Sequence, residues 1–246
     1  MIAKEGIREI GLATLILGGI AALAYWLFWP LAILPLAVWL WVLAFFRDPP
    51  RRRAFAPGEL CSPADGTVTE IAELDHHESI GGPATRIGIF LSLFNVHVNR
   101  SPCSGRVRSL YYRAGEFLDA RHPECGRRNE SNTLTIDPEP SLPGPVEVRQ
   151  IAGLVARRII CHARANEPLR IGQRFGMIKF GSRTELIVPR LADTRVEVKL
   201  GDKVHGGLTV LIRQPASELA GHTAGAKVGQ TRIPSAAPIG VGSERG

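Results

Sequence analysis

The pattern of hydrophobic and polar positions changes at about residue 50. No charged residue occurs from Ile10 to Phe46, a run of 37 positions. As one straight helix this run would be about 55 Å long, against about 30 Å for the hydrocarbon core of a bilayer. Pro30 lies near its middle and divides it into stretches at about residues 10–27 and 31–46. Each stretch is close to the length that crosses a membrane, so residues 1–50 are predicted to form a transmembrane helical hairpin.

Basic residues flank the apolar run on both sides. Lys4 and Arg8 precede it, and Arg47 and the arginines at 51–53 follow it. Because basic residues near membrane ends stay on the cytoplasmic side, we expect the hairpin in the cell (inner) membrane, with both its ends and the remaining domain in the cytoplasm. A re-entrant or interfacial hairpin stays open. A signal peptide is disfavoured because its apolar core is shorter and ends at a cleavage site of small residues.

After residue 50 the chain changes to short alternating or apolar runs bounded by glycine and proline. This pattern is typical of β-strands, so residues 51–215 are predicted to form a mainly β domain, with residues 111–120 as a helix or loop. Strands are expected at residues 85–91, 96–99, 132–136, 146–154, 155–162, 175–180, 184–188, 195–200 and 209–213. Residues 216–246 are rich in Ala, Gly, Ser and Pro and lack aromatic residues, which predicts a flexible tail.

Two segments of the β region have a similar shape, Ser-Pro-Ala-Asp-Gly-Thr-Val at 62–68 and Gly-Asp-Lys-Val-His-Gly-Gly at 201–207. Both resemble the strand-turn-strand pieces of lipoyl-like and biotinyl-like domains, so the expected architecture is a barrel-sandwich hybrid. No lysine lies at a hairpin tip in the surroundings that carrier domains need. The likeness therefore predicts a fold and not a swinging-arm function.

The formal charge of +7 is compatible with a nucleic-acid partner or with an anionic membrane surface. The hairpin favours the membrane surface, and no recognition helix or zinc module indicates nucleic acid. Four widely spaced cysteines without a Cys-x-x-Cys pair argue against a zinc or disulfide framework; they are Cys61, Cys103, Cys125 and Cys161. Cys103 is expected to be a small buried side chain.

One cluster of residues resembles a set of metal ligands. Its members are Glu73, Asp75, His76, His77 and Glu78. Imidazole and carboxylate groups do bind metals, but this polar stretch is expected to be a solvated turn between strands. No metal site is predicted.

The parts of an activated nucleophile occur at Asp65, His97 and Ser182. A histidine that takes the hydroxyl proton of a serine activates it for attack on a carbonyl, and Gly181 offers an unhindered one directly before Ser182. Each residue also has an ordinary explanation, as a turn or a strand position. A membrane-tethered serine hydrolase and a noncatalytic scaffold stay open, although no Gly-x-Ser-x-Gly elbow surrounds Ser182.

Several ordered motifs indicate a family. They are Phe-Arg-Asp-Pro at 46–49, Ser-Pro-Ala-Asp-Gly at 62–66, Phe-Asn-Val-His-Val-Asn-Arg-Ser-Pro at 94–102, Asn-Glu at 129–130, Gln-Ile-Ala-Gly-Leu at 150–154 with its continuation to 159, and Arg-Phe-Gly-Met-Ile-Lys-Phe-Gly-Ser-Arg at 174–183. With these motifs, residues 1–213 resemble the phosphatidylserine decarboxylase proenzymes of the short bacterial and archaeal type.

The resemblance implies an enzyme that makes its own cofactor. The proenzyme would cut itself between Gly181 and Ser182 into a large chain, residues 1–181, and a small chain, residues 182–246. The two chains would form a heterodimer, and a higher oligomer stays open. Ser182 would become a pyruvoyl group that forms a Schiff base with the headgroup amine of a membrane phospholipid. Phosphatidylserine would then lose CO2 and yield phosphatidylethanolamine, with no metal needed.

The resemblance also implies roles for two other residues. His97, oriented by Asp65, would act as base in the cut and as acid in turnover. Longer branches of the family carry a threonine after the cut and a second histidine three residues before the catalytic one, where this chain has Arg183 and Phe94. A pyruvoyl enzyme acting on a soluble amino acid is disfavoured because it would not need the hairpin. Candidates for binding the headgroup phosphate are Arg100, Arg106, Arg108, Arg127, Arg128 and Arg183.

Overall fold

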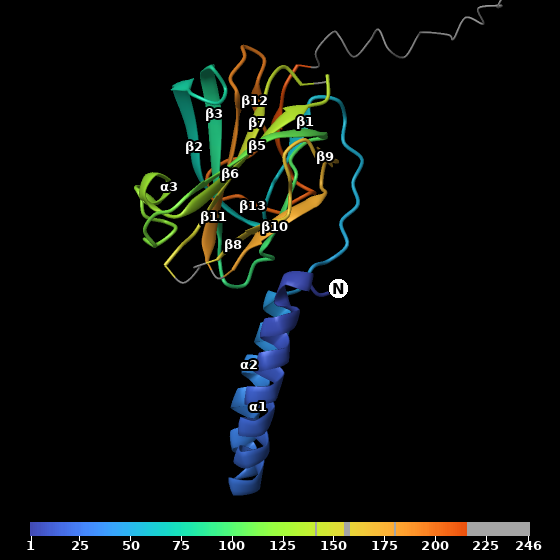
Figure 1. Cartoon of the computed structure of the whole chain (residues 1–246), viewed down its shortest axis with the longest axis vertical. Helices are drawn as coiled ribbons and strands as arrows, with labels where there is room; N and C mark the ends of the chain where they lie inside the picture. The colour runs from blue at the N-terminus through green and yellow to red at the C-terminus, as the bar shows by residue number, and fades with distance from the viewer. Residues whose placement is uncertain (141, 155–157, 180, 216–246) are drawn as a thin grey trace, which may run out of the picture.

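A computed structural model describes residues 1–140, 142–154, 158–179 and 181–215. Figure 1 shows two parts, a β domain and a long helical hairpin that projects from one end of it. The predicted tail at 216–246, residues 155–157 of a predicted strand, and Phe180 lie outside the described residues.

The hairpin has two helices joined by a short turn. Its elements are η1 (Lys4–Gly6), α1 (Ile7–Leu27), η2 (Trp29–Ala32) and α2 (Ile33–Phe45), where η is a 3-10 helix. Pro30 lies in the first turn of η2, where its missing N–H leaves no helical hydrogen bond unmade. The two helices were expected at 10–27 and 31–46.

The first arm of the hairpin has the composition of a membrane span. The helical segment Lys4–Leu27 is 24 residues long, has a mean hydropathy of 2.0 and buries none of its apolar window. It is therefore long and apolar enough to cross a membrane. The returning segment Trp29–Phe45 is apolar but shorter.

The described part of the β domain contains three antiparallel sheets. The largest has eight strands in the order β13-β2-β3-β11-β7-β6-β5-β9, and the two small sheets have the orders β1-β14-β12 and β4-β10-β8. The strands are β1 (Glu59–Cys61), β2 (Gly66–His77), β3 (Gly82–Leu91), β4 (Val98–Arg100), β5 (Gly105–Arg113), β6 (Ser131–Pro138), β7 (Val146–Ile151), β8 (Ile159–Cys161), β9 (Pro168–Leu169), β10 (Arg174–Ile178), β11 (Ser182–Pro189), β12 (Arg195–Val196), β13 (Lys203–Val204) and β14 (Val210–Arg213). One short helix, α3 (Cys125–Arg128), follows β5. The prediction of a mainly β fold is confirmed.

All three sheets contribute to one hydrophobic core. Ile87 and Ile89 point inward from β3 at the period of two that a strand requires. Leu186 of β11, Phe175 of β10 and Ile212 of β14 join them, and all five side chains are buried. The core thus fixes β11, which begins at Ser182, relative to the small sheet that contains β4.

The two similar segments seen in the sequence lie side by side. Lys203 pairs with Thr67 and Val204 with Gly66, where β13 joins the edge of β2. A Cβ on Gly206 would lie 3.1 Å from the backbone of Ala64, so the second turn packs closely on the first. This places the backbone of 206 beside the side chain of residue 65.

The structure corrects the expectation of a polar turn at residues 73–78. Glu73, Asp75, His76 and His77 lie on β2, which continues to His77, and only Glu78 lies in the turn that follows. These polar side chains occur on a strand because this end of β2 is largely exposed. Among the described residues, no group of three His, Cys, Asp or Glu side chains is placed to hold a metal ion.

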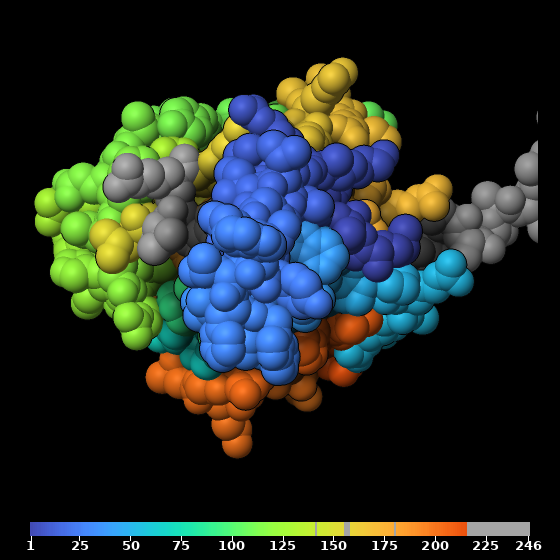
Figure 2. Space-filling model, turned by 90° about the horizontal axis from the view of Figure 1, so that it is seen from below, coloured from blue at the N-terminus to red at the C-terminus, as the bar shows by residue number. Residues whose placement is uncertain are grey.

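The base of the hairpin packs directly on the β domain, and Figure 2 shows the hairpin against the lower face of the domain. Phe45 and Phe46 at the end of α2 are buried against Val96, Val98 and Met177. Polar contacts surround this apolar cluster: Lys179 Nζ to Glu9 Oε1 at 2.6 Å, Arg47 Nη2 to the Phe94 carbonyl at 2.7 Å, and the buried Asp48 to Arg100 and Arg174, each at 2.7 Å. The end of α2 is therefore part of the wall around the β4 segment.

Candidate active site

His97 lies directly before β4, at the base of the hairpin, and is fully buried. Its Nδ1 lies 2.9 Å from the Asn95 carbonyl oxygen, and its Nε2 accepts the Gly181 N–H at 3.3 Å. A neutral imidazole has one N–H and one lone pair, so acceptance at Nε2 assigns the proton to Nδ1. The Phe45 ring covers the imidazole, with 4.3 Å between ring centroids. The basic nitrogen of His97 is thus held beside the residue that precedes Ser182.

Burial lowers the pKa of His97 from 6.5 to about 4, because desolvation penalises the charged imidazolium. The positive charge of Arg47 acts in the same direction, whereas the Asn95 carbonyl and the negative charge of Asp65 act against it. His97 is therefore neutral at pH 7, and its Nε2, which accepts the Gly181 N–H at 3.3 Å, carries no proton.

Ser182 is the first residue of β11 and pairs with Leu91 of β3. Its Oγ is buried and has no hydrogen-bond partner among the described residues. Burying a hydroxyl without a partner costs free energy, so such groups need an explanation. Gly181 has a φ of +65°, a left-handed conformation that side chains disfavour. A Cβ there would meet only Leu93, at 3.9 Å, so conformation and not space requires this glycine.

The role of Gly153 is not visible in its motif. A Cβ on Gly153 would lie closer than 3.0 Å to the Gly181 carbonyl oxygen and 3.3 Å from the Ala120 Cβ. Gly153 does not have a positive φ, so close approach is what requires a glycine at this position. Gly153 therefore packs directly against the Gly181 carbonyl, which Ser182 is predicted to attack.

Asn129 fixes the wall that contains Gly153. Its Nδ2 donates to the carbonyls of Leu118 and Ala152, both at 2.8 Å, and its Oδ1 accepts the Leu118 N–H at 3.0 Å. The first two bonds tie the segment before residue 120 to the residue before Gly153. The sequence singled out Asn129 by resemblance, and the structure shows its positioning contacts.

Asp65 does not orient His97 by a hydrogen bond in this structure. Its carboxylate is buried in a bidentate ion pair with Arg51, with 2.7 Å between Nη2 and Oδ2, and accepts the Gly206 N–H at 2.8 Å. His205 Nδ1 lies 3.4 Å away on the same carboxylate. The Asn95 carbonyl, and not Asp65, contacts Nδ1 of His97. A catalytic role of Asp65 stays a prediction.

Polar side chains of two other motifs form a buried network that joins strands. Gln150 Nε2 donates to Asn99 Oδ1 at 2.9 Å, Asn99 Nδ2 donates to Thr184 Oγ1 at 3.1 Å, and Asn132 Nδ2 donates to Gln150 Oε1 at 3.0 Å. The network links β4 with β6, β7 and β11. It therefore sets the position of the His97 segment relative to the strand that begins at Ser182.

The six arginines proposed for phosphate binding all have partners within the protein. Arg100 binds Asp48, and Arg183, at the position where longer family branches have threonine, binds Glu70 and Glu185. The remaining four lie at the surface and bind the Asn166 carbonyl (Arg106), Asp137 (Arg108), Glu124 (Arg127) and Glu116 (Arg128). Structural contacts account for all six. Arg121, which the sequence did not single out, lines a pocket together with Gly181.

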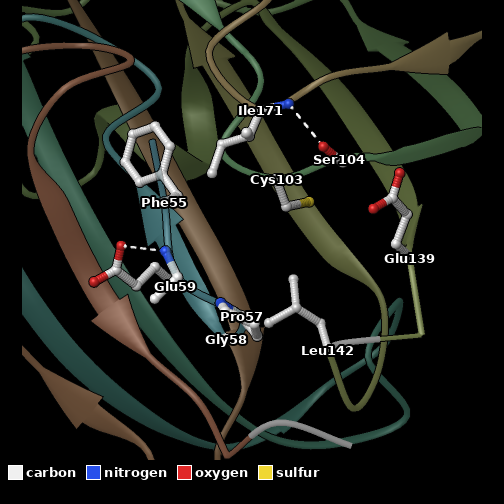
Figure 3. Close-up of a pocket in the computed structure, with 10 residues that line it drawn as sticks. Phe55, Pro57, Gly58, Glu59, Cys103, Ser104, Glu139, Leu142 and Ile171 are labelled. Carbon is white, nitrogen blue, oxygen red and sulfur yellow. Dashed lines mark hydrogen bonds between the residues drawn. The ribbon is translucent and has the colours of Figure 1, made fainter. Parts of the chain in front are cut away.

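A pocket of about 210 Å³ lies beside Gly181. It is lined by Phe90, Leu93, Asp119, Ala120, Arg121 and Leu154 together with Gly181. A different pocket, of about 290 Å³, is shown in Figure 3, where Phe55, Cys103 and Leu142 are among the lining residues. The two pockets share no residue, and neither is lined by Asp65, His97 or Ser182, but the first one includes Gly181, whose carbonyl the predicted cut would attack. The pocket beside Gly181 is therefore the candidate substrate site.

Cys103 is buried, as expected, and burial raises the pKa of its thiol well above the usual range. Burial also raises the pKa of the Cys61 thiol to about 12. Because the thiolate is the reactive form of cysteine, neither group is suited to act as a nucleophile.

The sequence of this chain is similar to those of known proteins of one family. A family model described as phosphatidylserine decarboxylase matches residues 39–212, which include Asp65, His97 and Ser182. The chain belongs to the phosphatidylserine decarboxylase family. Relatives of this family include the phosphatidylserine decarboxylase proenzyme of Rhodopirellula baltica, which is 44% identical over 85% of this chain and 87% of its own length. The proenzyme of Syntrophus aciditrophicus is 41% identical over 84% and 94%, and that of Chlorobium chlorochromatii is 45% identical over 71% and 79%. The resemblance drawn from the sequence motifs is confirmed.

Proposed function

We propose that this chain is a self-processing enzyme that decarboxylates phosphatidylserine to phosphatidylethanolamine, with a pyruvoyl group derived from Ser182. Family membership supports the reaction class. The observation that carries the residue assignment is the buried Ser182 Oγ without a described partner, directly after a glycine whose N–H is bound to His97 Nε2.

Self-cleavage uses groups that this chain supplies. His97 Nε2 takes the Ser182 hydroxyl proton while Oγ attacks the Gly181 carbonyl carbon, and the amide becomes an ester as the proton passes to the Ser182 nitrogen. Removal of the Ser182 Cα proton then breaks the bond between Cβ and Oγ, which frees the Gly181 carboxylate and leaves dehydroalanine. Addition of water and loss of ammonia convert this end into a ketone.

The surroundings of residue 182 fit a pyruvoyl group. This position is buried, and the Oγ atom that cleavage would remove holds no hydrogen bond to the described residues. The pyruvoyl ketone supplies an electron sink for the pair of electrons left behind when CO2 departs. His97 would donate a proton in turnover through its Nε2. Its Nδ1 can stay on the Asn95 carbonyl during this transfer, so the ring does not have to move.

The position of β11 supports a two-chain product. From residue 182 onward the strand pairs with β3 and, from Arg183, with β7. Cleavage before Ser182 would leave these ladders in place, so the large chain 1–181 and the small chain 182–246 would stay together as a heterodimer.

The hairpin supports action on a lipid at the inner membrane, with the β domain in the cytoplasm. A substrate with two acyl chains stays in the bilayer, and α2 ends beside His97. Basic residues 51–53 directly after the hairpin favour an anionic membrane surface. Anchoring thereby holds the site where the headgroup is presented.

Denaturing electrophoresis with intact-mass analysis tests this proposal. Purified wild type is expected as two chains, whereas Ser182→Ala and His97→Ala are each expected as one uncut chain. Ser109→Ala and His76→Ala are matched controls at exposed strand positions and should process normally. A single wild-type chain would favour a hydrolase or scaffold instead, and normal processing of either mutant would remove that residue from the mechanism.

A further inference from the structure

The pocket beside Gly181 contains one pair of opposite charges in its lining, Asp119 and Arg121. Arg121 Nε and Nη2 donate to the two Asp119 oxygens at 3.0 and 2.8 Å, and the Arg121 N–H donates to Oδ1 at 2.8 Å. The guanidinium carbon lies 5.6 Å from the centre of the Phe90 ring, which adds a cation–π contact. Arg121 is therefore held from two sides, at the mouth of the pocket that reaches Gly181.

Arg121 keeps donor capacity for a ligand. Its side chain is 67% exposed, and its Nη1 has no protein partner in the part of the chain that the structure describes. A guanidinium has five N–H donors in a fixed plane and binds oxyanions through two of them at once. None of the six arginines considered from the sequence lines this pocket.

The rim of the pocket is apolar on the side of the hairpin. Leu93 and Leu154 line the pocket and are 38% and 60% exposed, and Phe94, next to Leu93, is 74% exposed. Arg47, directly after α2, donates to the Phe94 carbonyl at 2.7 Å. An apolar rim tied to the base of the hairpin suits the glycerol and first acyl carbons of a lipid, whose charged headgroup then reaches inward.

We propose that Arg121 binds the phosphate of the phospholipid headgroup, while Asp119 and Phe90 position its guanidinium. The inference rests on the proposed function, because the headgroup amine must reach the group formed at residue 182. In the substrate, the phosphate lies between the glycerol and the amine. In the protein, Arg121 lines the same pocket as the leucines of the apolar rim and Gly181.

The test uses the mature two-chain enzyme and measures protection of the small-chain ketone against hydroxylamine by intact mass. Glycerophosphoethanolamine carries the phosphate without a carboxylate, and free serine carries the carboxylate without a phosphate. Arg121→Gln is expected to need roughly 10- to 100-fold more glycerophosphoethanolamine for half protection, the usual effect of a charged hydrogen bond, and an unchanged amount of serine. Arg127→Gln, an exposed arginine outside the pocket, should behave as wild type.

Equal protection of Arg121→Gln and wild type by glycerophosphoethanolamine would overturn the inference. A parallel loss of protection by serine would also overturn it, because Arg121 would then bind the carboxylate. If Arg121→Gln does not mature, Arg121→Lys keeps the charge without the paired donors and should show a smaller loss of the same kind; wild-type behaviour of that variant counts against the inference. Failure of the proposed function is distinguishable, since wild type would then carry no ketone.

Discussion

Replacing Gly153 by alanine adds one methyl group next to the carbonyl that we expect Ser182 to attack. The backbone of Gly153 is open to alanine because its φ is not positive. The new Cβ, however, lies closer than 3.0 Å to the Gly181 oxygen, with Ala120 behind it at 3.3 Å. The carbonyl has to move by roughly 1 Å to make an ordinary contact, and a displacement of that size in a reacting group costs about 100-fold in rate. This corresponds to about 2.7 kcal/mol of activation free energy.

Pulse-labelling of newly made protein, followed by electrophoresis, measures this rate as conversion of one chain into two. Gly82→Ala is the matched control, because a Cβ on Gly82 meets no atom within 4 Å and its φ is not positive. The control should process at the wild-type rate, and Gly153→Ala about 100-fold more slowly. Wild-type processing of Gly153→Ala would show that the Gly181 carbonyl is not attacked in the arrangement described, and would refute the reasoning.

Three further predictions concern His97. Because burial lowers its pKa to about 4, self-cleavage should be independent of pH from 8 to about 5 and fall about tenfold per unit below about 4, in contrast to a fall that begins at 6.5. Because of the same pKa shift, the unfolded chain binds more protons than the folded chain between about pH 4 and pH 6.5. The contribution of His97 to folding stability is therefore present above pH 6.5 and is lost as the pH falls through 4. Denaturant titration across this pH range checks whether stability falls in this direction. Phe45→Ala removes a buried ring that covers His97. It should lower the free energy of unfolding by about 3–5 kcal/mol and, by admitting water, shift the pH dependence of cleavage to higher pH. Leu40→Ala, at an exposed position of α2, should have neither effect, and an unchanged pH profile in Phe45→Ala would contradict this role for the ring.

The strands that the sequence predicts well are those with an apolar face buried in the core. β3 and β11 show this, since each alternates or runs apolar between glycine and proline boundaries. The far half of β2 was expected to be a turn because its side chains are charged. Glu73, Asp75 and His76 remain exposed on a strand whose backbone pairs with β3. The hydropathy pattern does not reveal this backbone pairing.

The predicted site residues come together only in part, and the reasons are tertiary. Motifs located His97 and Ser182, and the fold brings the Gly181 N–H to the histidine. The ion pair of Arg51 with Asp65 joins the exit of the hairpin to a turn of the β domain, and no spacing rule predicts such a partner. A glycine such as Gly153 gives no sign of which atom approaches it.

The intact mass of the small chain tests the central claim most directly. Wild-type enzyme that releases CO2 from phosphatidylserine vesicles should contain a chain of residues 182–246 that is lighter, by one ammonia, than the same residues with an N-terminal serine, and that reacts with hydroxylamine. A small chain with a free serine amine, or a single uncut and ketone-free chain in a preparation with the same activity, would contradict the account.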